Sequence, residues 1–434
     1  MSKGNRKGML EQLQLTEVGP ARQLEWTLAP RLNLITGDNG LGKTFLLECA
    51  WWALTGTWAR KYQAFPYPDT AKHTSSIAFR LSKDSSPGKS FTAVYDWEQQ
   101  DWKLTTKRNV LPGLVIFAQA DGSFAIWDVA KYHLTSEKRR LEGSNEGLLR
   151  LSRSEVFDGL SEEQGNRKKV LCNGLIDDWV KWQYTSDTSP FHTFTAALKT
   201  LSPHLSEEPL IPGQPTRLSW DDVREIPTLT FPYGDVPILL CSAGIQRIVA
   251  LAYILVWAWN EHITTSRLLR RNPERSIVLM IDEMEAHLHP FWQRAIVPAL
   301  MEIVQALADQ VQTQLLIATH SPLVLASVES LFDETKDHLF HLYLENGEVH
   351  LEHEPFVKRG RVDLWLMSDT FGLKQPRSQS AEEAIEEAKH LQQAKDPLKE
   401  DVQTVHDKLI KVLAQDDEFW PRWLYFAEQR GIRV

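Results

Sequence analysis

The sequence is poor in cysteine. Its 434 residues include three, Cys49, Cys172 and Cys241, which lie far apart and form no Cys-x-x-Cys pair. This spacing excludes a disulfide framework and the usual thiolate zinc sites. Isolated free thiols are typical of a reducing compartment, so we expect the protein in the cytoplasm.

Long apolar runs are also missing. The longest, from Ile248 to Trp259, is shorter than the roughly 20 residues that cross a bilayer. The polar N-terminus has no signal-peptide apolar region, so we expect no membrane partner. The absence of sustained heptads excludes a long coiled coil, and there is no internal repeat.

The chain also lacks an excess of positive charge. The formal net charge is −9, from 57 acidic and 48 basic residues. This balance argues against a surface that coats nucleic acid. Local basic clusters such as Arg167–Lys169 remain, so nucleic-acid binding is possible but is not indicated by the charge. A hydrophobic content of 42% is that of a globular protein.

The first of four motifs in the chain is a glycine-rich loop. Gly37-Asp38-Asn39-Gly40-Leu41-Gly42-Lys43-Thr44 fits the phosphate-binding pattern G-x-x-x-x-G-K-[ST], between a predicted strand (Asn33–Thr36) and a predicted helix (Phe45–Trp52). The backbone of Gly37, Asn39, Gly40 and Gly42 would cradle phosphates at the helix N-terminus. Lys43 would reach the β- and γ-phosphates, and the Thr44 hydroxyl would bind Mg²⁺. The loop predicts a site for ATP and Mg²⁺.

A second motif follows a buried strand. The apolar run Ser276–Ile281 ends in two carboxylates, Asp282 and Glu283. Such a run suits a parallel strand that is buried on both faces, and ligands bind at the carboxyl ends of these strands. We expect Asp282 to hold Mg²⁺ and Glu283 to orient or deprotonate the attacking water. The alternative is a solvated acidic turn.

A third motif has the same form. The strand Leu315–Ala318 ends in Thr319-His320-Ser321-Pro322. We expect His320 to donate a hydrogen bond to the γ-phosphate and to sense its loss. The alternative is a histidine with a structural role only.

The fourth motif precedes a strongly apolar predicted helix. In Ser242-Ala243-Gly244-Ile245-Gln246-Arg247, the residues Ser242 and Gly244 fit the Ser and second Gly of the signature Leu-Ser-Gly-Gly-Gln, whereas Cys241, Ala243 and Ile245 depart from it. Ser242 is also a good N-cap. The alternative is a capped core helix without a role in nucleotide binding.

The chain is predicted to have four parts. They are an N-terminal lobe with the glycine-rich loop (1–136), an insertion (137–225), a C-terminal lobe with the other three motifs (226–375) and a helical tail (376–434). In the tail, we expect helices at Ala381–Lys395 and Leu398–Leu413, the first capped by Ser380.

Two further features are expected within the lobes. Asn346-Gly347 predicts a two-residue β-hairpin turn. Gln119, which ends the predicted strand Leu114–Ala118, is a candidate for a glutamine that contacts water and magnesium, with an ordinary hairpin residue as the alternative.

Together, the glycine-rich loop, Ser242/Gly244/Arg247, Ile281–Pro290 and Thr319–Pro322 resemble the bacterial ABC-type AAA-family ATPases of the OLD, RecF and Rad50 kind. The resemblance implies an α/β fold, an ABC-type P-loop ATPase with two lobes, an inserted mixed segment and a helical C-terminal tail. It also implies ATP hydrolysis at a site shared by two copies, with Ser242 and Gly244 of one copy over the γ-phosphate held by the other. The expected assembly is a homo-oligomer, at least an ATP-sandwich dimer.

Many ATPases of this group serve anti-phage defence, including those of the Septu and PARIS systems. The tail has no acidic nuclease pattern, unlike the Toprim domain that follows the ATPase in OLD proteins. The resemblance therefore implies a sensor or scaffold that works with a separate toxic effector, such as a nuclease, and responds to a phage-derived trigger protein. Two alternatives remain: a DNA-repair or chromosome-maintenance ATPase of RecF/Rad50 type, and the nucleotide-binding subunit of a membrane transporter.

Overall fold

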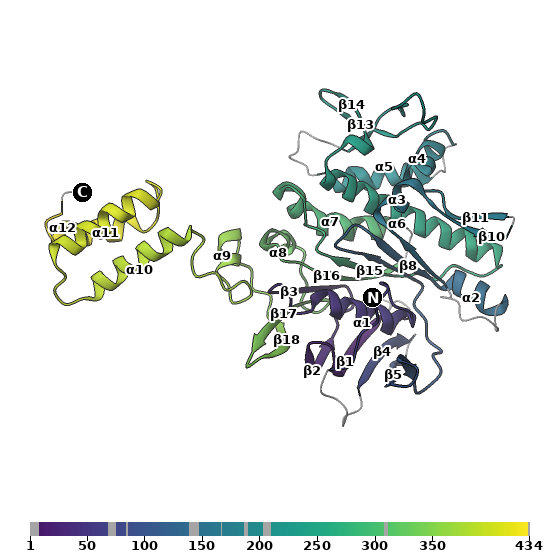
Figure 1. Cartoon of the computed structure of the whole chain (residues 1–434), viewed down its shortest axis with the longest axis horizontal. Helices are drawn as coiled ribbons and strands as arrows, with labels where there is room; N and C mark the ends of the chain where they lie inside the picture. The colour runs from purple at the N-terminus through teal and green to yellow at the C-terminus, as the bar shows by residue number, and fades with distance from the viewer. Residues whose placement is uncertain are drawn as a thin grey trace. The chain divides into compact units, whose positions relative to one another are not determined.

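The computed structural model describes residues 8–67, 75–83, 86–138, 147–165, 167–185, 190–202, 210–307 and 311–432. The chain divides into two compact units, residues 1–360 and 361–434 (Figure 1). The predicted N-terminal lobe and insertion fall in the first unit, whereas the C-terminal lobe, expected to end at residue 375, extends past the boundary at Gly360. The second unit begins before the predicted tail, which was expected to start at residue 376.

An eight-stranded mixed sheet forms the centre of the first unit. Its order is β18-β17-β3-β16-β15-β7-β8-β9, and the five strands from β17 to β7 are parallel. The strands are β3 (Leu32–Gly37), β7 (Leu114–Ala118), β8 (Phe124–Asp128), β9 (Leu148–Leu151), β15 (Ser276–Asp282), β16 (Gln312–Ala318), β17 (Asp337–Glu345) and β18 (Glu348–Glu354). Because β3, β16 and β15 are adjacent and parallel, their carboxyl ends meet at one edge of the sheet.

The hairpin between β17 and β18 turns at the residues that the sequence predicts. Asn346 and Gly347 both have positive φ, 52° and 82°, and Glu345 pairs with Glu348. This is the geometry of a type I′ turn, so that prediction is confirmed.

A second sheet of five antiparallel strands has the order β2-β1-β4-β5-β6. Its strands are β1 (Leu10–Val18), β2 (Ala21–Thr27), β4 (Ser76–Lys83), β5 (Ser86–Asp96) and β6 (Asp101–Leu104). Helix α1 (Lys43–Thr55) shares one hydrophobic core with both sheets. It is apolar on nearly all sides because it is enclosed by them.

Helices cover the opposite face of the eight-stranded sheet, where Figure 1 shows α6 and α7. The helices of this unit beyond α1 are α2 (Val129–Lys138), α3 (Arg153–Asp158), α4 (Leu175–Gln183), α5 (Pro190–Leu201), α6 (Ala243–Leu268), α7 (Pro290–Ala306) and α8 (Pro322–Val328). Among the described residues, α6 is the one helix long and apolar enough to cross a membrane, and 83% of its most apolar window is buried inside the unit. That degree of burial is typical of a core helix.

The predicted insertion lies partly outside the described residues. Besides β9, α3, α4, α5 and β12 (Ile211–Pro212), the described part includes a hairpin of β10 (Leu160–Gln164) and β11 (Arg167–Cys172). Helix α4 begins at Leu175, because β11 continues to Cys172 and Gly174 then turns the chain at φ 91°. Downstream lie the short strands β12, β13 (Thr228–Phe231) and β14 (Gly234–Pro237), followed by one 3₁₀ turn, η1 (Ile238–Leu240).

The second unit is a small helical bundle with its own core. Its helices are α9 (Val362–Leu366), α10 (Gln379–Gln393), α11 (Lys399–Val412) and α12 (Trp420–Gln429). Ser380 was expected to cap the first long helix, and this was wrong. Ser378 is the cap, and its hydroxyl accepts a hydrogen bond from the Ala381 amide (3.3 Å). Either serine has a hydroxyl that can cap a helix. Ser378 is the cap because α10 already begins at Gln379.

Candidate functional site

The glycine-rich loop connects the end of β3 to the start of α1, and two of its glycines are required by its geometry. Gly37 has φ 134°, and a Cβ atom there would lie 2.2 Å from the Leu342 carbonyl oxygen on the neighbouring strand β17. Gly42 has φ 96° and is the N-cap of α1. A side chain at either position would strain the backbone, and one at Gly37 would also collide with strand β17.

Lys43 is the first residue of α1, and its side chain points back into the loop. Its Nζ donates hydrogen bonds to the carbonyl oxygens of Gly37 and Asp38, both at 2.9 Å. The residue is 4% exposed, and burial lowers the pKa of its ammonium group although Glu283 and Asp282 lie nearby. The loop thus holds a cation against backbone dipoles at a helix N-terminus, which is an environment suited to phosphate.

Asp282 joins β15 to this loop. The Thr44 hydroxyl donates a hydrogen bond to Asp282 Oδ2 (2.8 Å). Asp282 is 1% exposed, and burial raises the pKa of its carboxyl. Within the described chain its other oxygen, Oδ1, has no hydrogen-bond partner. A hydroxyl and a carboxylate with an unused buried oxygen are a donor set that suits Mg²⁺.

Glu283 and His320 end adjacent parallel strands and face each other. His320 Nε2 lies 3.3 Å from Glu283 Oε1. Glu283 has φ 48°, an uncommon conformation for a residue with a side chain. Burial, followed by the charge of Lys43, lowers the pKa of the His320 imidazole. The lowered pKa favours the uncharged imidazole, which has one N–H donor and one acceptor nitrogen.

Glu285 fixes the backbone beneath this pair. Its Oε1 accepts hydrogen bonds from the Thr319 hydroxyl and the His320 amide, both at 2.6 Å. The side chain therefore ties the loop after β15 to the turn after β16. This contact holds His320 beside Glu283 with little freedom.

One cavity of about 450 Å³ collects the predicted residues. Its lining includes Asn39, Gly40, Gly42, Lys43, Thr44, Phe45, Glu48, Arg60, Tyr62, Gln63, Ala64, Glu283 and His320. Three of the four sequence motifs thus meet at a single site, through elements far apart in the chain. Four predicted residues do not line it: Gly37, Asp282, Ser242 and Gly244. Gly37 and Asp282 are nevertheless hydrogen-bonded to Lys43 and Thr44, which do.

The fourth motif lies at the start of α6. The Ser242 hydroxyl accepts a hydrogen bond from the Ile245 amide (3.4 Å), so its predicted role as N-cap is confirmed. A Cβ at Gly244 would lie 2.7 Å from the His287 carbonyl oxygen. The beginning of α6 therefore packs directly on the loop that follows Glu283.

Arg247 links this helix to the ends of two strands. Its Nη2 donates to the carbonyl oxygens of Gln119 and Asp282, both at 3.3 Å. Burial lowers the pKa of its guanidinium. The start of α6 is in this way attached to the end of β15 and to the residue that follows β7, although its own motif does not line the cavity.

Three polar residues near the cavity were missed or only weakly indicated by the sequence. Arg60 donates to Gln119 Oε1 (2.9 Å) and forms ion pairs with Glu48 (3.2 Å) and Asp282 (3.5 Å). Burial raises the pKa of the Glu48 carboxyl to about 7. Glu48 follows Thr44 by four residues and so lies on the same helix face, a signal that could have identified it. Nothing near Arg60 in the sequence indicates its position.

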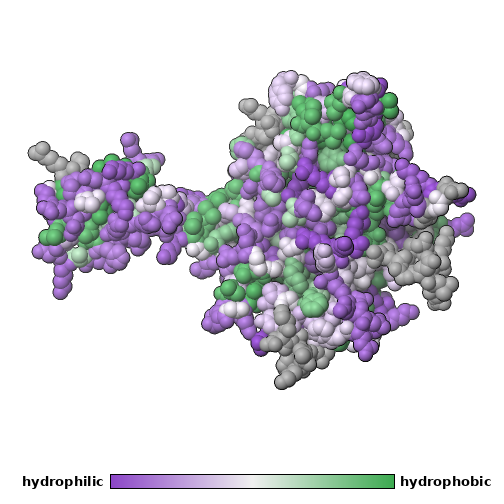
Figure 2. All heavy atoms as spheres, in the orientation of Figure 1, coloured by the Kyte–Doolittle hydropathy of each residue, from purple (hydrophilic) through white to green (hydrophobic). Residues whose placement is uncertain are grey.

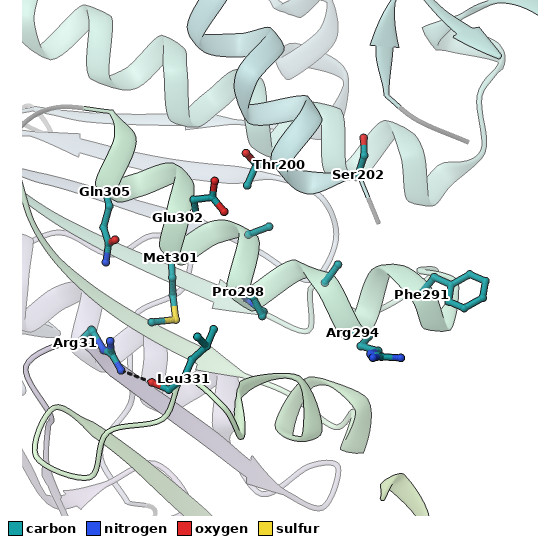
Figure 3. Close-up of a pocket in the computed structure, with 12 residues that line it drawn as sticks. Arg31, Thr200, Ser202, Phe291, Arg294, Pro298, Met301, Glu302, Gln305 and Leu331 are labelled. Atoms are coloured by element: carbon teal, nitrogen blue, oxygen red, sulfur yellow. Dashed lines mark hydrogen bonds between the residues drawn. The ribbon is translucent and has the colours of Figure 1, made fainter. Parts of the chain in front are cut away.

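A second cavity, of about 510 Å³, lies elsewhere in the first unit. Figure 3 shows that α7 supplies most of its lining, with Arg294, Met301 and Glu302 among the labelled residues. Arg31 donates a hydrogen bond to the Leu331 carbonyl at its rim (2.8 Å). No predicted site residue lines this cavity, so the site is assigned to the smaller one.

Sequence models of two protein families match the chain. One, described as "AAA domain, putative AbiEii toxin, Type IV TA system", matches residues 140–326. The other, described as "AAA domain", matches residues 12–171. The two matches cover the glycine-rich loop, both carboxylates and His320, so the chain carries AAA-type ATPase domains.

Two curated proteins are similar to parts of this chain. The Retron Ec83 probable ATPase of Escherichia coli is 24% identical over 61% of the chain, which spans 43% of that protein, less than half its length. The Septu protein PtuA of Bacillus thuringiensis is 21% identical over 87% of this chain and 88% of its own length. The resemblance to defence ATPases expected from the motifs is thereby confirmed.

Solved structures with a similar arrangement include an SMC head domain from Thermotoga maritima, at 15% identity and a TM-score of 0.39 over 80% of this chain and 99% of that one. The recombination mediator RecF is similar over 81% of this chain and 100% of its own, at 13% identity and a TM-score of 0.38.

Proposed function

We propose that this chain, an AAA-type ATPase with an ABC-like fold, hydrolyses ATP at a site that two copies complete together, and serves as the sensor or scaffold subunit of a bacterial anti-phage defence complex in the cytoplasm. The observation that carries the first part is the convergence of three motifs on one cavity of about 450 Å³. The fourth motif, Ser242 and Gly244, lies outside that cavity.

In this proposal, the phosphates of ATP lie against the backbone of Gly37, Asn39, Gly40 and Gly42. Lys43 already points its ammonium group to this place, and ATP would exchange loop carbonyls for phosphate oxygens as its partners. Binding is thus supported by a cation and a helix N-terminus that need little rearrangement.

Thr44 and Asp282 would hold Mg²⁺, which when bound neutralises phosphate charge and polarises the transferred phosphoryl group. The 2.8 Å contact between their side chains places both oxygens on one side of the loop. Asp282 Oδ1, which has no protein partner among the described residues, is available to bind the ion directly or through water.

Glu283 is the proposed general base for the attacking water, and His320 the residue that senses the γ-phosphate. The uncharged imidazole lies 3.3 Å from the carboxylate and can orient it. We assign to Ser242 and Gly244 the role of closing over the γ-phosphate of a second copy, since both stand at the N-terminus of α6 and outside their own chain's cavity.

Mixing two impaired variants tests whether two copies share a site. Lys43→Ala removes the phosphate-binding lysine, and Ser242→Ala removes the signature hydroxyl. A mixed dimer has one site with both defects and one site with neither, so turnover should return on mixing to about a quarter of the wild-type rate, by random pairing and site counting. Each variant alone should keep its own low rate, which for Ser242→Ala is about a tenth of the wild-type rate. No recovery on mixing, with both proteins folded, would show that each chain works alone.

The defence role rests on similarity to the retron ATPase and to PtuA. A separate toxic effector, a nuclease by the family resemblance, would be held by this chain until a phage-derived protein is detected. Purification of the protein from its native operon, with and without ATP, tests this role by mass. A stable assembly that carries a second protein supports it. A lone chain that dimerises with ATP and captures DNA in a salt-sensitive manner would instead support the RecF/Rad50-type repair function.

A further inference from the structure

The segment between α5 and α6 exposes large apolar side chains. The exposed residues are Ile211, Leu218, Trp220, Val223, Tyr233, Leu239 and Leu240. Trp220 is 90% exposed and Val223 is 78% exposed. In Figure 2, hydrophobic residues gather on the surface over the region that Figure 1 labels β13 and β14. We call residues 211–240 the apolar segment.

Hydrogen bonds hold this segment in one conformation. The Arg217 guanidinium donates to the carbonyl oxygens of Ser219 (2.8 Å), Trp220 (2.6 Å) and Asp222 (2.7 Å). Arg224 forms ion pairs with Asp222 and with Asp158 of α3. The Trp220 backbone is therefore ordered although its side chain meets solvent. An anchor that is already ordered loses little entropy when a partner covers it.

The apolar segment continues directly into the signature motif. Leu240 ends η1, two residues before Ser242. Gln246 donates from Nε2 to the carbonyl oxygens of Ile238, Leu239 and Cys241, at 3.2, 3.0 and 3.1 Å. These bonds attach η1 to the first turn of α6. A molecule that reaches Ser242 and Gly244 from outside therefore also meets the exposed side chain of Leu240.

The charge of the region also fits a buried contact. No lysine occurs between Lys199 and Lys336, and lysine is depleted from the cores of protein interfaces, where tryptophan and tyrosine are enriched. The acidic side chains nearest Trp220 are occupied, because Asp222 pairs with Arg224 and Asp221 accepts from the Ser219 hydroxyl. Covering this surface leaves few charges without partners.

A matching surface borders the nucleotide cavity. Tyr62 lines the cavity and is 81% exposed, and Phe65 is 57% exposed. Phe65 contacts Tyr95 and Trp97 edge to face, with ring centroids 5.9 and 6.0 Å apart. The P-loop side of the chain thus presents an exposed aromatic rim, and the signature side presents the apolar segment.

We propose that the apolar segment of one copy packs on the aromatic rim of a second copy, with Trp220 as its anchor, when ATP brings the two copies together. The proposal rests on the shared ATP site described above, which places the signature motif of one chain over the P-loop of the other. Because each chain carries both surfaces, two copies form two equivalent contacts around a two-fold axis. Closure buries exposed aromatic area in addition to the contacts with phosphate.

Light scattering across a range of protein concentrations tests the proposal. All samples carry Glu283→Gln, so that ATP with Mg²⁺ is bound but not consumed. Trp220→Ala is compared with Tyr425→Ala, a matched exposed aromatic residue in the second unit. Truncation of an anchor residue should raise the concentration for half-maximal ATP-dependent association by about tenfold or more. Tyr425→Ala should leave it unchanged, and Trp220→Phe should restore most of the association.

Each other result has a definite meaning. Unchanged association of Trp220→Ala would overturn the proposal, as would an equal loss in Tyr425→Ala. Intact self-association with loss of a co-purifying second protein would assign the surface to that protein instead. If Glu283→Gln alone gains no mass with ATP, the shared site itself fails, and this proposal falls with it. Thermal melting checks the fold, which should not change because Trp220 is almost fully exposed.

Discussion

The P-loop side and the signature side of this chain differ in how much of their polar surface is already paired. On the P-loop side, the Lys43 ammonium group donates to a carbonyl oxygen of its own loop. The Thr44 hydroxyl donates to the Asp282 carboxylate. On the signature side, the Ser242 hydroxyl accepts from the Ile245 amide of its own helix N-terminus, and the apolar side chains beside it are exposed. Among the described residues, the phosphate-binding groups of the first side are therefore largely paired within the chain, whereas the second side places apolar side chains in solvent beside its hydroxyl.

This difference indicates how control can be built into such a site. In the proposed function, the buried charges would bind nucleotide with little reorganisation, because their positions are fixed by strands β3, β15 and β16. Catalysis, in the proposed function, waits for residues from another chain. ATP binding and assembly are then thermodynamically linked, since each stabilises the state that favours the other.

Glu283→Gln should give the largest effect, because it removes the proposed general base on the P-loop side. Turnover should fall by about 10²- to 10⁴-fold, because the amide cannot accept a proton from water. ATP binding should persist, since Lys43 and Thr44 are untouched. Steady-state phosphate release and calorimetric ATP titration measure the two quantities. Glu418→Gln, an exposed carboxylate in the second unit, is the control. Unchanged turnover in the first variant would remove Glu283 from the chemistry.

Lys43→Ala tests the same side at the binding step. The loss of a charge-assisted contact of about 1.5–3 kcal/mol should weaken ATP binding by about 10- to 150-fold. Calorimetry measures the affinity, and Lys107→Ala, at an exposed lysine, is the control. Normal ATP affinity in the Lys43 variant would contradict the role of the loop.

Ser242→Ala tests whether the signature side acts in turnover without acting in ATP binding by its own chain. ATP affinity at low protein concentration should stay normal, because Ser242 does not line its own cavity. Turnover at high concentration should fall by about tenfold, from loss of one hydrogen bond of about 1–1.5 kcal/mol in the closed state. Loss of the N-cap should also lower the free energy of unfolding by about 1 kcal/mol. A weaker affinity at low concentration would place Ser242 in its own chain's site.

The pH profile should show the smallest effect. Burial and Lys43 lower the pKa of His320 below its usual 6.5, so the folded chain protonates this imidazole only at lower pH than an exposed histidine. Turnover should therefore change by less than about twofold between pH 7.5 and 6.5, where a free imidazole is about half protonated at the lower end. Phosphate release at constant ionic strength measures the profile. A midpoint at or above 6.5 that disappears in His320→Gln would contradict this assignment.

The local elements of the site could be predicted because each motif contains its own structural cause. Gly37 and Gly42 occupy positive-φ positions, and Ser242 has the hydroxyl that caps α6. The run Ser276–Ile281 is buried throughout, as expected of a central parallel strand. These features depend on neighbours a few residues away, which a sequence displays directly.

Other features could not be predicted, because they depend on distant parts of the chain. The capping serine of α10 is Ser378 rather than Ser380, since two serines of equal chemistry are separated only by how far the helix extends. The hairpin β10–β11 in the insertion has charged residues on both strands, so its sequence carries no alternating apolar pattern. The two-unit division at Gly360 likewise has no strong composition change to mark it.

The sequence by itself determined the chemistry of this protein: a phosphate-binding loop, two carboxylates and a histidine, each at the end of a strand. Only the tertiary structure decided which of these groups meet. The strand order β3-β16-β15-β7 brings Thr44 to Asp282, His320 to Glu283, and Arg60 to Glu48 and Gln119. The physical reason is that strand order follows from the burial of whole faces against α1 and α6, whereas the motifs record only local backbone and side-chain requirements.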